Sequence, residues 1–316
     1  MHTVCAQCVH MFPMLRRDIY AVSRKLGQRR LCASMDAFGQ LLQRGVGASA
    51  KLHAMKASIV DALAERGWCA LDGILDDEAG LHVRRELAQL FRDGAYSPSY
   101  SSVAETGEKL WRPNVHMMEL DAESWRRAPS VVVLLSELMG ALPEVVNTGF
   151  GGHALDGHAH PQLSSRVFGH KLAVSTAAGA RYPKHLDNVT GANDKRKLTA
   201  VYYANAGWDV AKQGGAIRLY DSLTHPVYTD VAPAGEGGLD RLLLFWSDLI
   251  VHEVLPMTSG PAPSPQQWSI DGSNDSDAHH RHTFTLWLTT ENDACLLDPR
   301  SSLYNLRTFH YPDKSE

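Results

Sequence analysis

Cysteine is scarce in this sequence, and its few residues are scattered along the chain. They are Cys5, Cys8, Cys32, Cys69 and Cys295. An odd number without regular spacing argues against a disulfide framework and favours free thiols in a reducing compartment. Cys5 and Cys8 form a CxxC pair, but no second Cys or His pair follows at the spacing of a zinc site. We therefore expect an intracellular protein, cytoplasmic or nuclear.

Strong charge imbalance and long apolar runs are also missing. The formal net charge is −4 and the isoelectric point is near 6.5. Nucleic acid and anionic membranes attract basic surfaces, so neither is expected as the main partner. The most apolar stretches, such as Val131 to Leu135, are much shorter than the roughly 20 residues that cross a bilayer. We expect a soluble protein without a membrane span.

The first 50 residues differ in kind from the rest of the chain. Their basic residues Arg16, Arg17, Arg24, Lys25, Arg29, Arg30 and Arg44 stand against only Asp18 and Asp36. The segment lacks the apolar centre of a secretory signal. Two interpretations stay open: a basic extension that is partly helical or disordered, and a targeting segment for a mitochondrion or another organelle.

Residues 51–160 are predicted to form a helical support region. Apolar residues at helical spacing and turn residues at the ends define its elements. They are a helix from Lys51 to Gly67, a strand from Trp68 to Ile74, a helix that Asp76 or Asp77 caps and Gly94 ends, and a helix within Asp121 to Leu142 that Pro129 bends or splits. The segment from Tyr96 to Lys109 is rich in Ser and Tyr, which predicts an exposed loop, and such a loop can cover a substrate cleft.

After residue 160 the sequence changes to short β-branched or aromatic runs that are separated by turns. They are Lys171 to Ser175, Leu198 to Tyr203, Ala216 to Tyr220, Arg241 to Trp246, Val251 to Leu255 and Thr283 to Thr289. Many short strands at this spacing predict a sandwich, jelly roll or barrel. We assign residues 161–295 to this core, with the preceding helices packed on one sheet in an α+β fold, and residues 296–316 to a C-terminal tail.

His185, Leu186 and Asp187 form an HxD motif. On an extended strand both polar side chains point to one face. His252 follows the Leu-rich run that ends at Trp246, where a later strand can return to the motif. Two imidazoles and one carboxylate on one side of an iron ion leave positions open for a co-substrate and dioxygen. These residues therefore predict a non-haem Fe(II) site.

A co-substrate with a distal carboxylate needs a cation in the same core. Between His252 and Arg281 the sequence contains neither Lys nor Arg. Arg281 opens the last predicted strand, and it offers the bidentate geometry that suits a carboxylate. Thr285 falls on the same strand face, whereas His280 and His282 fall on the opposite one and are not expected to bind metal.

Five blocks of the sequence carry a family resemblance. In order they are Tyr182 to Asn188, Tyr202 to Asp209, Gly214 to Arg218, Asp240 to Asp248 and His252 to Val254. They resemble the hypoxia-sensing prolyl hydroxylases of the Fe(II) and 2-oxoglutarate dioxygenase superfamily across residues 165–290, with a weaker likeness from about residue 60. The Gly214–Gly215 pair within them suits a hairpin with positive φ.

The resemblance implies a double-stranded β-helix core of the jelly-roll, cupin-like kind and a set of site residues. His185, Asp187 and His252 would bind iron; Arg281, Thr285 and Tyr203 would bind 2-oxoglutarate. It also implies an activity, the hydroxylation of a prolyl residue in an intracellular protein, as in oxygen sensing. Fe(II), 2-oxoglutarate and O2 would be required, ascorbate would support turnover, and succinate and CO2 would be released.

The sequence departs from this family at two places. The long Pro- and Ser-rich stretch from Gly260 to His280 separates His252 from Arg281 and is predicted to be a surface insertion. The strand before the HxD motif carries Ser175, Thr176 and Ala177 where the family has a tyrosine that contacts 2-oxoglutarate. That hydrogen bond is either missing or supplied by Thr176 or Tyr182.

Two other functions stay open. One is a dioxygenase that acts on a non-prolyl residue or a small molecule, which peptide-dependent succinate release would distinguish. The other is a non-catalytic binding module on the same fold, against which the intact ligand set argues.

Overall fold

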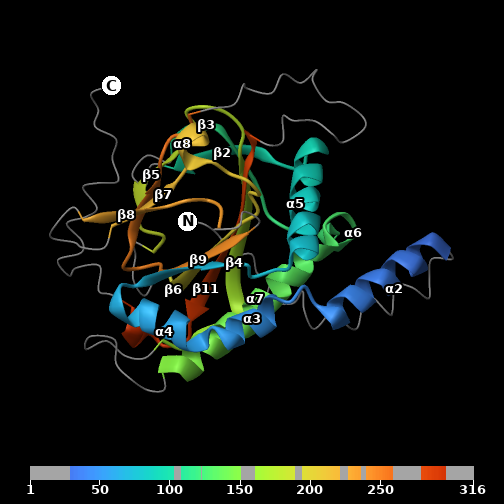
Figure 1. Ribbon diagram of the computed structural model, residues 1–316, viewed down its shortest axis with the longest axis horizontal. Coiled ribbons are helices and arrows are strands. Elements are labelled where there is room, and N and C mark those ends of the chain that lie inside the picture. The colour runs from blue at the N-terminus through green and yellow to red at the C-terminus, as the bar shows by residue number, and fades with distance from the viewer. Residues whose placement is uncertain are drawn as a thin grey trace.

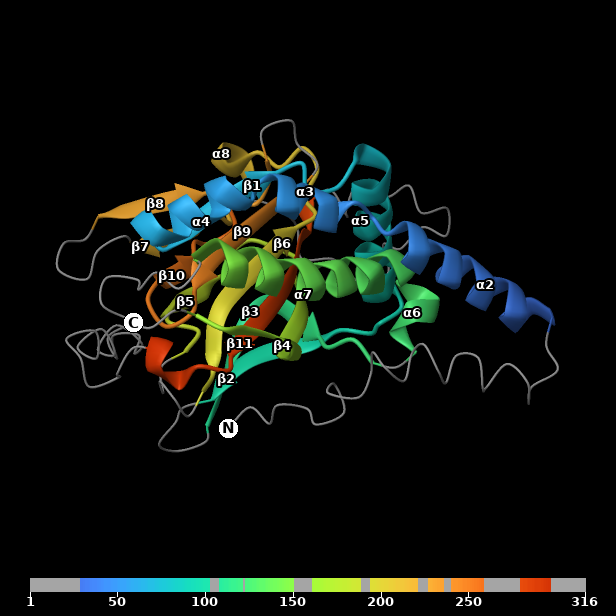
Figure 2. The same ribbon diagram turned by 90° about the horizontal axis from the view of Figure 1, so that it is seen from below.

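The computed structural model describes residues 29–102, 108–121, 123–150, 161–188, 194–220, 227–235, 240–258 and 279–296. In this part of the chain two antiparallel sheets face each other, and the longer helices gather on one side of them (Figures 1 and 2). The Cys5–Cys8 pair, most of the Gly260 to His280 stretch and the tail after residue 296 lie outside the described residues.

The major sheet has seven strands in the order β1-β9-β6-β11-β4-β3-β2. They are β1 (Trp68–Asp72), β9 (Arg241–Trp246), β6 (Arg196–Tyr203), β11 (Arg281–Thr290), β4 (Leu163–Ser175), β3 (Lys109–Met118) and β2 (Ser97–Ser102). The minor sheet has four, in the order β5-β10-β7-β8. They are β5 (Tyr182–His185), β10 (Val251–Val254), β7 (Ile217–Tyr220) and β8 (Tyr228–Val231).

Helices cover the outer face of the major sheet (Figures 1 and 2). The helices of this layer and its margin are α2 (Arg29–Arg44), α3 (Ala48–Ala54), α4 (Lys56–Glu65), α5 (Asp77–Arg92), α6 (Ser124–Arg127) and α7 (Pro129–Phe150). The short α8 (Val210–Gln213) lies apart from α3, α4 and α7, and a 3-10 turn is formed by Asp293–Cys295. The helices α3, α4 and α7 run beside one another, while α2 projects from the body. This arrangement confirms the α+β jelly-roll prediction and leaves the inner faces of the sheets for the site.

Two apolar cores hold these layers. The first joins the helices to the outer face of the major sheet, and Leu134, Leu172 and Leu286 are fully buried in it. The second lies between the two sheets, where Tyr203 and Phe245 meet residues of the minor sheet. Removing this surface from water stabilises the fold by roughly 25 cal/mol per Å² of apolar area.

The helix α7 is the most apolar element of the described chain. By length and composition it could cross a membrane, contrary to our expectation that no segment would. However, 72% of the relevant window is buried inside the protein. Glu86 of α5 accepts hydrogen bonds from the backbone N–H groups of Ser130 and Val131 at 3.1 and 3.0 Å, which satisfies the first turn of α7. This helix is therefore the core helix of the fold.

The helical predictions are confirmed with changed boundaries. The stretch from Lys51 to Gly67 divides at Met55 into α3 and α4, and Gly67 has the expected positive φ of 79°. Asp76 caps α5 by accepting a hydrogen bond from the Ala79 N–H. Pro129 splits the next helix, as predicted, because it opens α7 where a missing N–H costs nothing.

Each predicted strand is present, but the loop predicted from Tyr96 to Lys109 is wrong. Its described parts form the strand β2 and the start of β3, which pair with each other. β2 lies at the sheet edge and is rich in Ser, so it shows no apolar alternation, and its pairing depends on tertiary context. The strand β8 was also not predicted, and the strand expected at the HxD motif ends at His185, before Asp187.

Candidate metal centre

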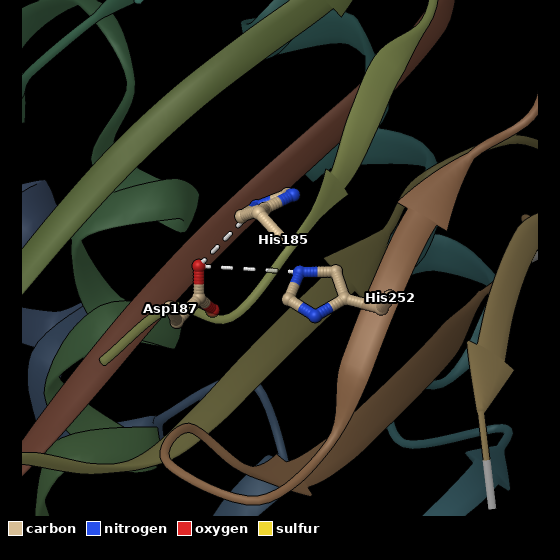
Figure 3. Close-up of side chains that lie close together, drawn as sticks. All are labelled: His185, Asp187 and His252. Atoms are coloured by element: carbon tan, nitrogen blue, oxygen red, sulfur yellow. Dashed lines mark ion pairs between the residues drawn. The ribbon is translucent and has the colours of Figure 1, made fainter. Parts of the chain in front are cut away.

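His185, Asp187 and His252 meet between the two sheets (Figure 3). The register of β10 on β5 sets His252 directly opposite His185, and Asp187 follows the end of β5. One carboxylate oxygen, Asp187 Oδ1, lies 3.6 Å from His185 Nε2 and 3.9 Å from His252 Nε2. One ligand atom from each residue lies within 4.8 Å of the others, so the three can hold one ion from one side.

The backbone orients both imidazoles. His185 Nδ1 is 2.7 Å from the carbonyl oxygen of Pro183, and His252 Nδ1 is 3.1 Å from that of Ile250. Each Nδ1 can donate its proton to a carbonyl, and this leaves Nε2 with its lone pair toward the other ligands. Such a second contact is typical of metal-binding histidines.

The other carboxylate oxygen of Asp187 is held by two donors. Thr199 Oγ1 donates to Oδ2 at 2.7 Å and Trp287 Nε1 donates to it at 2.9 Å. Ser247 Oγ lies 2.8 Å from Thr199 Oγ1. Because the Thr199 proton goes to Asp187, Ser247 donates the next hydrogen bond in this chain. Oδ1 is thereby left to face the histidines.

Electrostatics keeps Asp187 and His252 in the protonation states that a cation requires. Burial alone would raise the pKa of Asp187, but the neighbouring His185 and His252 outweigh it and hold that pKa well below its usual value. Burial lowers the pKa of His252 to about 4. At neutral pH the site therefore offers a carboxylate and a neutral imidazole, which a divalent metal prefers.

Arg281 lies buried on the same inner face, with an exposed fraction of 3%. Its guanidinium carbon is 5.1 Å from the centre of the Tyr203 ring, and burial lowers its pKa from the ordinary value. Within the described residues its Nε has no hydrogen-bond partner and no carboxylate pairs with it. A buried cation without a counter-charge is costly, so this residue fits the role of binding an anion.

Thr176 and Tyr182 were the two residues predicted to supply the hydrogen bond that the family's tyrosine makes, and the contacts of their hydroxyl groups distinguish them. Tyr182 Oη is buried and has no partner among the described residues, whereas Thr176 Oγ1 donates to the carbonyl of Asn114 at 3.3 Å. Tyr182 is therefore the better candidate for the hydrogen bond that the family's tyrosine would make. Thr285 lies on the Arg281 face of β11 and is 8% exposed.

Gly215 makes room for this arginine. It has a φ of +71°, as predicted for the glycine pair, and a Cβ there would lie 3.1 Å from Arg281 Cδ. The side chain of Arg281 thus packs against a position that only glycine fills without strain.

Sequence reasoning missed the residues that orient Asp187. Trp287 continues the alternation of Arg281, Thr283 and Thr285 by one more step. The alternation therefore predicts that Trp287 lies on the same face of the strand as Arg281. Thr199 pairs with Trp287 across β6 and β11, and that register is not visible in the sequence. His282, as predicted, lies apart from the metal ligands, beside His280 and Arg84.

Residues 171–289 match the family model of the 2OG-Fe(II) oxygenase superfamily. This segment is a 2OG-Fe(II) oxygenase domain. The oxygenase domain contains every site residue predicted above: His185, Asp187, Tyr203, His252, Arg281 and Thr285.

Relatives of the oxygenase domain are found among curated proteins. The hypoxia-inducible factor prolyl hydroxylase of Caenorhabditis elegans is 28% identical over 214 residues, which are 66% of this chain and 27% of that protein. Egl nine homolog 1 of Homo sapiens is 28% identical over 222 residues, 66% of this chain and 46% of that protein. The chain thus matches less than half the length of these two relatives.

Solved structures support the same fold. A prolyl hydroxylase of Trichoplax adhaerens, solved with a hypoxia-inducible factor peptide fragment, aligns with a TM-score of 0.58 at 21% identity, over 78% of this chain and 93% of that one. A prolyl 4-hydroxylase of Phytophthora capsici aligns with a TM-score of 0.56 at 22% identity, over 83% of this chain and 74% of that one. At these identities the likeness shows the fold.

Proposed function

We propose that the chain is an Fe(II)- and 2-oxoglutarate-dependent dioxygenase that hydroxylates a prolyl residue of an intracellular protein and releases succinate and CO2. The observation that carries the proposal is the pairing of two features on one inner face. A neutral imidazole, a second imidazole and a carboxylate converge on one point, and an unpaired buried arginine lies in the same space. The cluster of two imidazoles and a carboxylate suits a metal ion, and the buried arginine suits a carboxylate.

The proposed roles follow from the positions of the side chains. His185, Asp187 and His252 hold the metal from one side, and Thr199 and Trp287 keep Asp187 from rotating. Bound Fe(II) supplies the oxygen chemistry, with 2-oxoglutarate as the source of electrons and ascorbate as support.

Arg281 holds the distal carboxylate of 2-oxoglutarate, and Thr285 and Tyr203 flank it in this proposal. Tyr182 adds a hydroxyl from β5. The aromatic and apolar residues between the sheets exclude water from this space, which strengthens each of these polar contacts. The substrate enters from the side that is open to solvent, where His185 is 29% exposed.

A prolyl substrate is proposed from the relatives. Proteins with prolyl hydroxylase in their names match about two thirds of this chain. We further propose a cytoplasmic or nuclear location, with the basic N-terminal 50 residues as an extension or an organelle signal and residues 51–160 as a helical support for the core. Neither nucleic acid nor a membrane is part of the proposal.

The deciding experiment follows oxygen transfer to a protein. Candidate proteins are incubated with the enzyme, Fe(II), ascorbate and 2-oxoglutarate, and their intact masses are measured. We expect a gain of roughly 16 Da that requires 2-oxoglutarate and lies on proline when mapped by fragmentation. Mass gain on another residue or on a small molecule would favour the first alternative function. If 2-oxoglutarate is bound but never consumed, the chain is a binding module.

A further inference from the structure

Lys171 is a second unpaired cation beside the candidate metal centre. It lies in β4, opposite Thr285 of β11, and residues that oppose each other on paired strands share a face. Trp287 belongs to that face and donates to Asp187. Lys171 therefore projects into the space that contains the metal ligands.

Two aromatic rings hold the ammonium group of Lys171. Its Nζ lies 5.2 Å from the centre of the Tyr182 ring and 5.2 Å from that of the Trp287 ring. Tyr182 opens β5, which ends at His185, so both rings adjoin the ligand set. Cation–π contacts orient an ammonium group without neutralising its charge. The side chain of Lys171 is fixed in place with its charge still available.

Several other cations of the described chain have a carboxylate partner, whereas Lys171 has none. Lys197 is buried against Asp248 at 2.9 Å, and Arg218 pairs with Asp230 at 2.7 Å. In the part of the chain that the structure describes, the side chain of Lys171 has neither an ion pair nor a hydrogen bond. A half-buried, oriented and unpaired ammonium group next to an open site is suited to binding an anion.

The backbone of Lys171 lies at a different level of the sheet from that of Arg281, and counting the carboxylates of the co-substrate assigns the anion of Lys171. Ser175 lies opposite Arg281, and Lys171 is four residues away along the same strand. At about 3.3 Å per residue, the two levels of the sheet are about 13 Å apart. Arg281 and the metal account for the two carboxylates of 2-oxoglutarate, so a third anionic group has to come from the substrate.

We propose that Lys171 binds a carboxylate of the protein substrate, on an acidic residue next to the one that is hydroxylated. The inference rests on the proposed function, since it takes the metal centre as the reacting site. It names the substrate class more narrowly, as a segment with Asp or Glu at one fixed distance from the target residue. Lys171 is then a specificity-determining residue and not a ligand of the co-substrate.

The test uses the full-length protein and a pool of peptides from a digested proteome. After incubation with Fe(II), ascorbate and 2-oxoglutarate, mass spectrometry maps the hydroxylated residues and their neighbours. We expect Asp or Glu to be enriched about tenfold at one position, as for a charge-assisted contact, and this enrichment to disappear in Lys171→Met and persist in Lys171→Arg. Lys212→Met is the control, because Lys212 pairs with Asp209 on the exposed α8 and its loss removes the same charge.

Two further measurements separate the possible failures. Under nitrogen, with Fe(II) and 2-oxoglutarate bound, peptides retained on the immobilised protein report binding without turnover. If Asp or Glu is enriched in a way that depends on Lys171, but the hydroxylated residue is not proline, the result supports the inference and contradicts the prolyl part of the proposed function. Equal enrichment in wild type and Lys171→Met overturns the inference. So does a Lys171→Met variant that needs more 2-oxoglutarate and selects the same peptides, because the anion would then belong to the co-substrate.

Discussion

The two faces of β11 are buried to a similar degree but differ in chemistry. The outer face enters the core under the helices with Phe284, Leu286 and Leu288, each at most 1% exposed. The inner face carries Arg281, Thr283, Thr285 and Trp287, all of them largely buried. Apolar burial stabilises the outer face, whereas a buried cation without a partner opposes folding. Substitutions on the outer face should therefore change stability, and those on the inner face should change binding.

Asp187→Ala should have the largest effect at the inner face. It removes one of the proposed metal ligands, so we expect metal affinity and 2-oxoglutarate turnover to fall by more than about a hundredfold, beyond what loss of an orienting residue costs. Equilibrium dialysis with Fe(II) under nitrogen and succinate release measure the two. Asp293→Ala is the control, since Asp293 pairs with Lys195 at the surface. Unchanged metal affinity in Asp187→Ala would falsify the assignment.

Leu286→Ala should give the opposite outcome from the outer face. Leu286 is fully buried in the core that joins β11 to the helices. Its truncation should lower the free energy of unfolding by about 2–5 kcal/mol, because it leaves a cavity in a packed interior. Urea denaturation measures this loss, and the folded fraction should bind metal as the wild type does. A drop in metal affinity without a loss of stability would contradict the division between the faces.

Arg281→Met tests the inner face at the start of β11, away from the metal ligands. The variant keeps much of the side-chain volume but loses the charge, so we expect the KM for 2-oxoglutarate to rise roughly a hundredfold, as when one partner of a buried charge pair is removed. Stability in the absence of 2-oxoglutarate should be unchanged or higher, because an unpaired buried charge is removed. A lower free energy of unfolding with an unchanged KM would assign Arg281 a purely structural role.

Trp287→Phe should produce a smaller effect on the metal. Phenylalanine keeps the ring on the inner face but loses the donor to Asp187 Oδ2. We expect metal affinity to fall about tenfold, the lower range for residues that orient a ligand. Trp111→Phe serves as the control, because Trp111 is 59% exposed on the β2–β3 hairpin. Equal metal affinities in the two variants would show that Thr199 alone suffices.

Local patterns were enough to predict much of the fold. The run from Arg241 to Trp246 became β9 with the same boundaries, because a continuous apolar strand between two layers has a strong signal. The edge strand β2 has no such signal, since its Ser-rich sequence is stabilised only by pairing with β3. Strands at an edge are therefore the part of this fold that the sequence does not specify locally.

The site residues, too, could be predicted from the sequence only where a local pattern marks them. His185 and Asp187 were recognisable because they form one short motif, and Arg281 because the sequence before it lacks other cations. Lys171 belongs to no motif, and its place beside the metal ligands depends on the register between β4 and β11, two strands that are distant in sequence. Contacts of this kind appear only when the strands are paired.

His282 allows the mildest test of the outer face, through pH. It is fully buried, none of the described residues hydrogen-bonds to its ring nitrogens, and burial, together with Arg84, His280 and Arg92, holds its pKa well below 6.5. The unfolded chain binds the proton first, so below about pH 6.5 stability should fall by at most about 1.4 kcal/mol per pH unit from this group. Above that pH the contribution is constant. Urea denaturation with a chelator between pH 7.5 and 5.5 should give a shallower slope for His282→Leu, and parallel slopes would show that His282 does not titrate on unfolding.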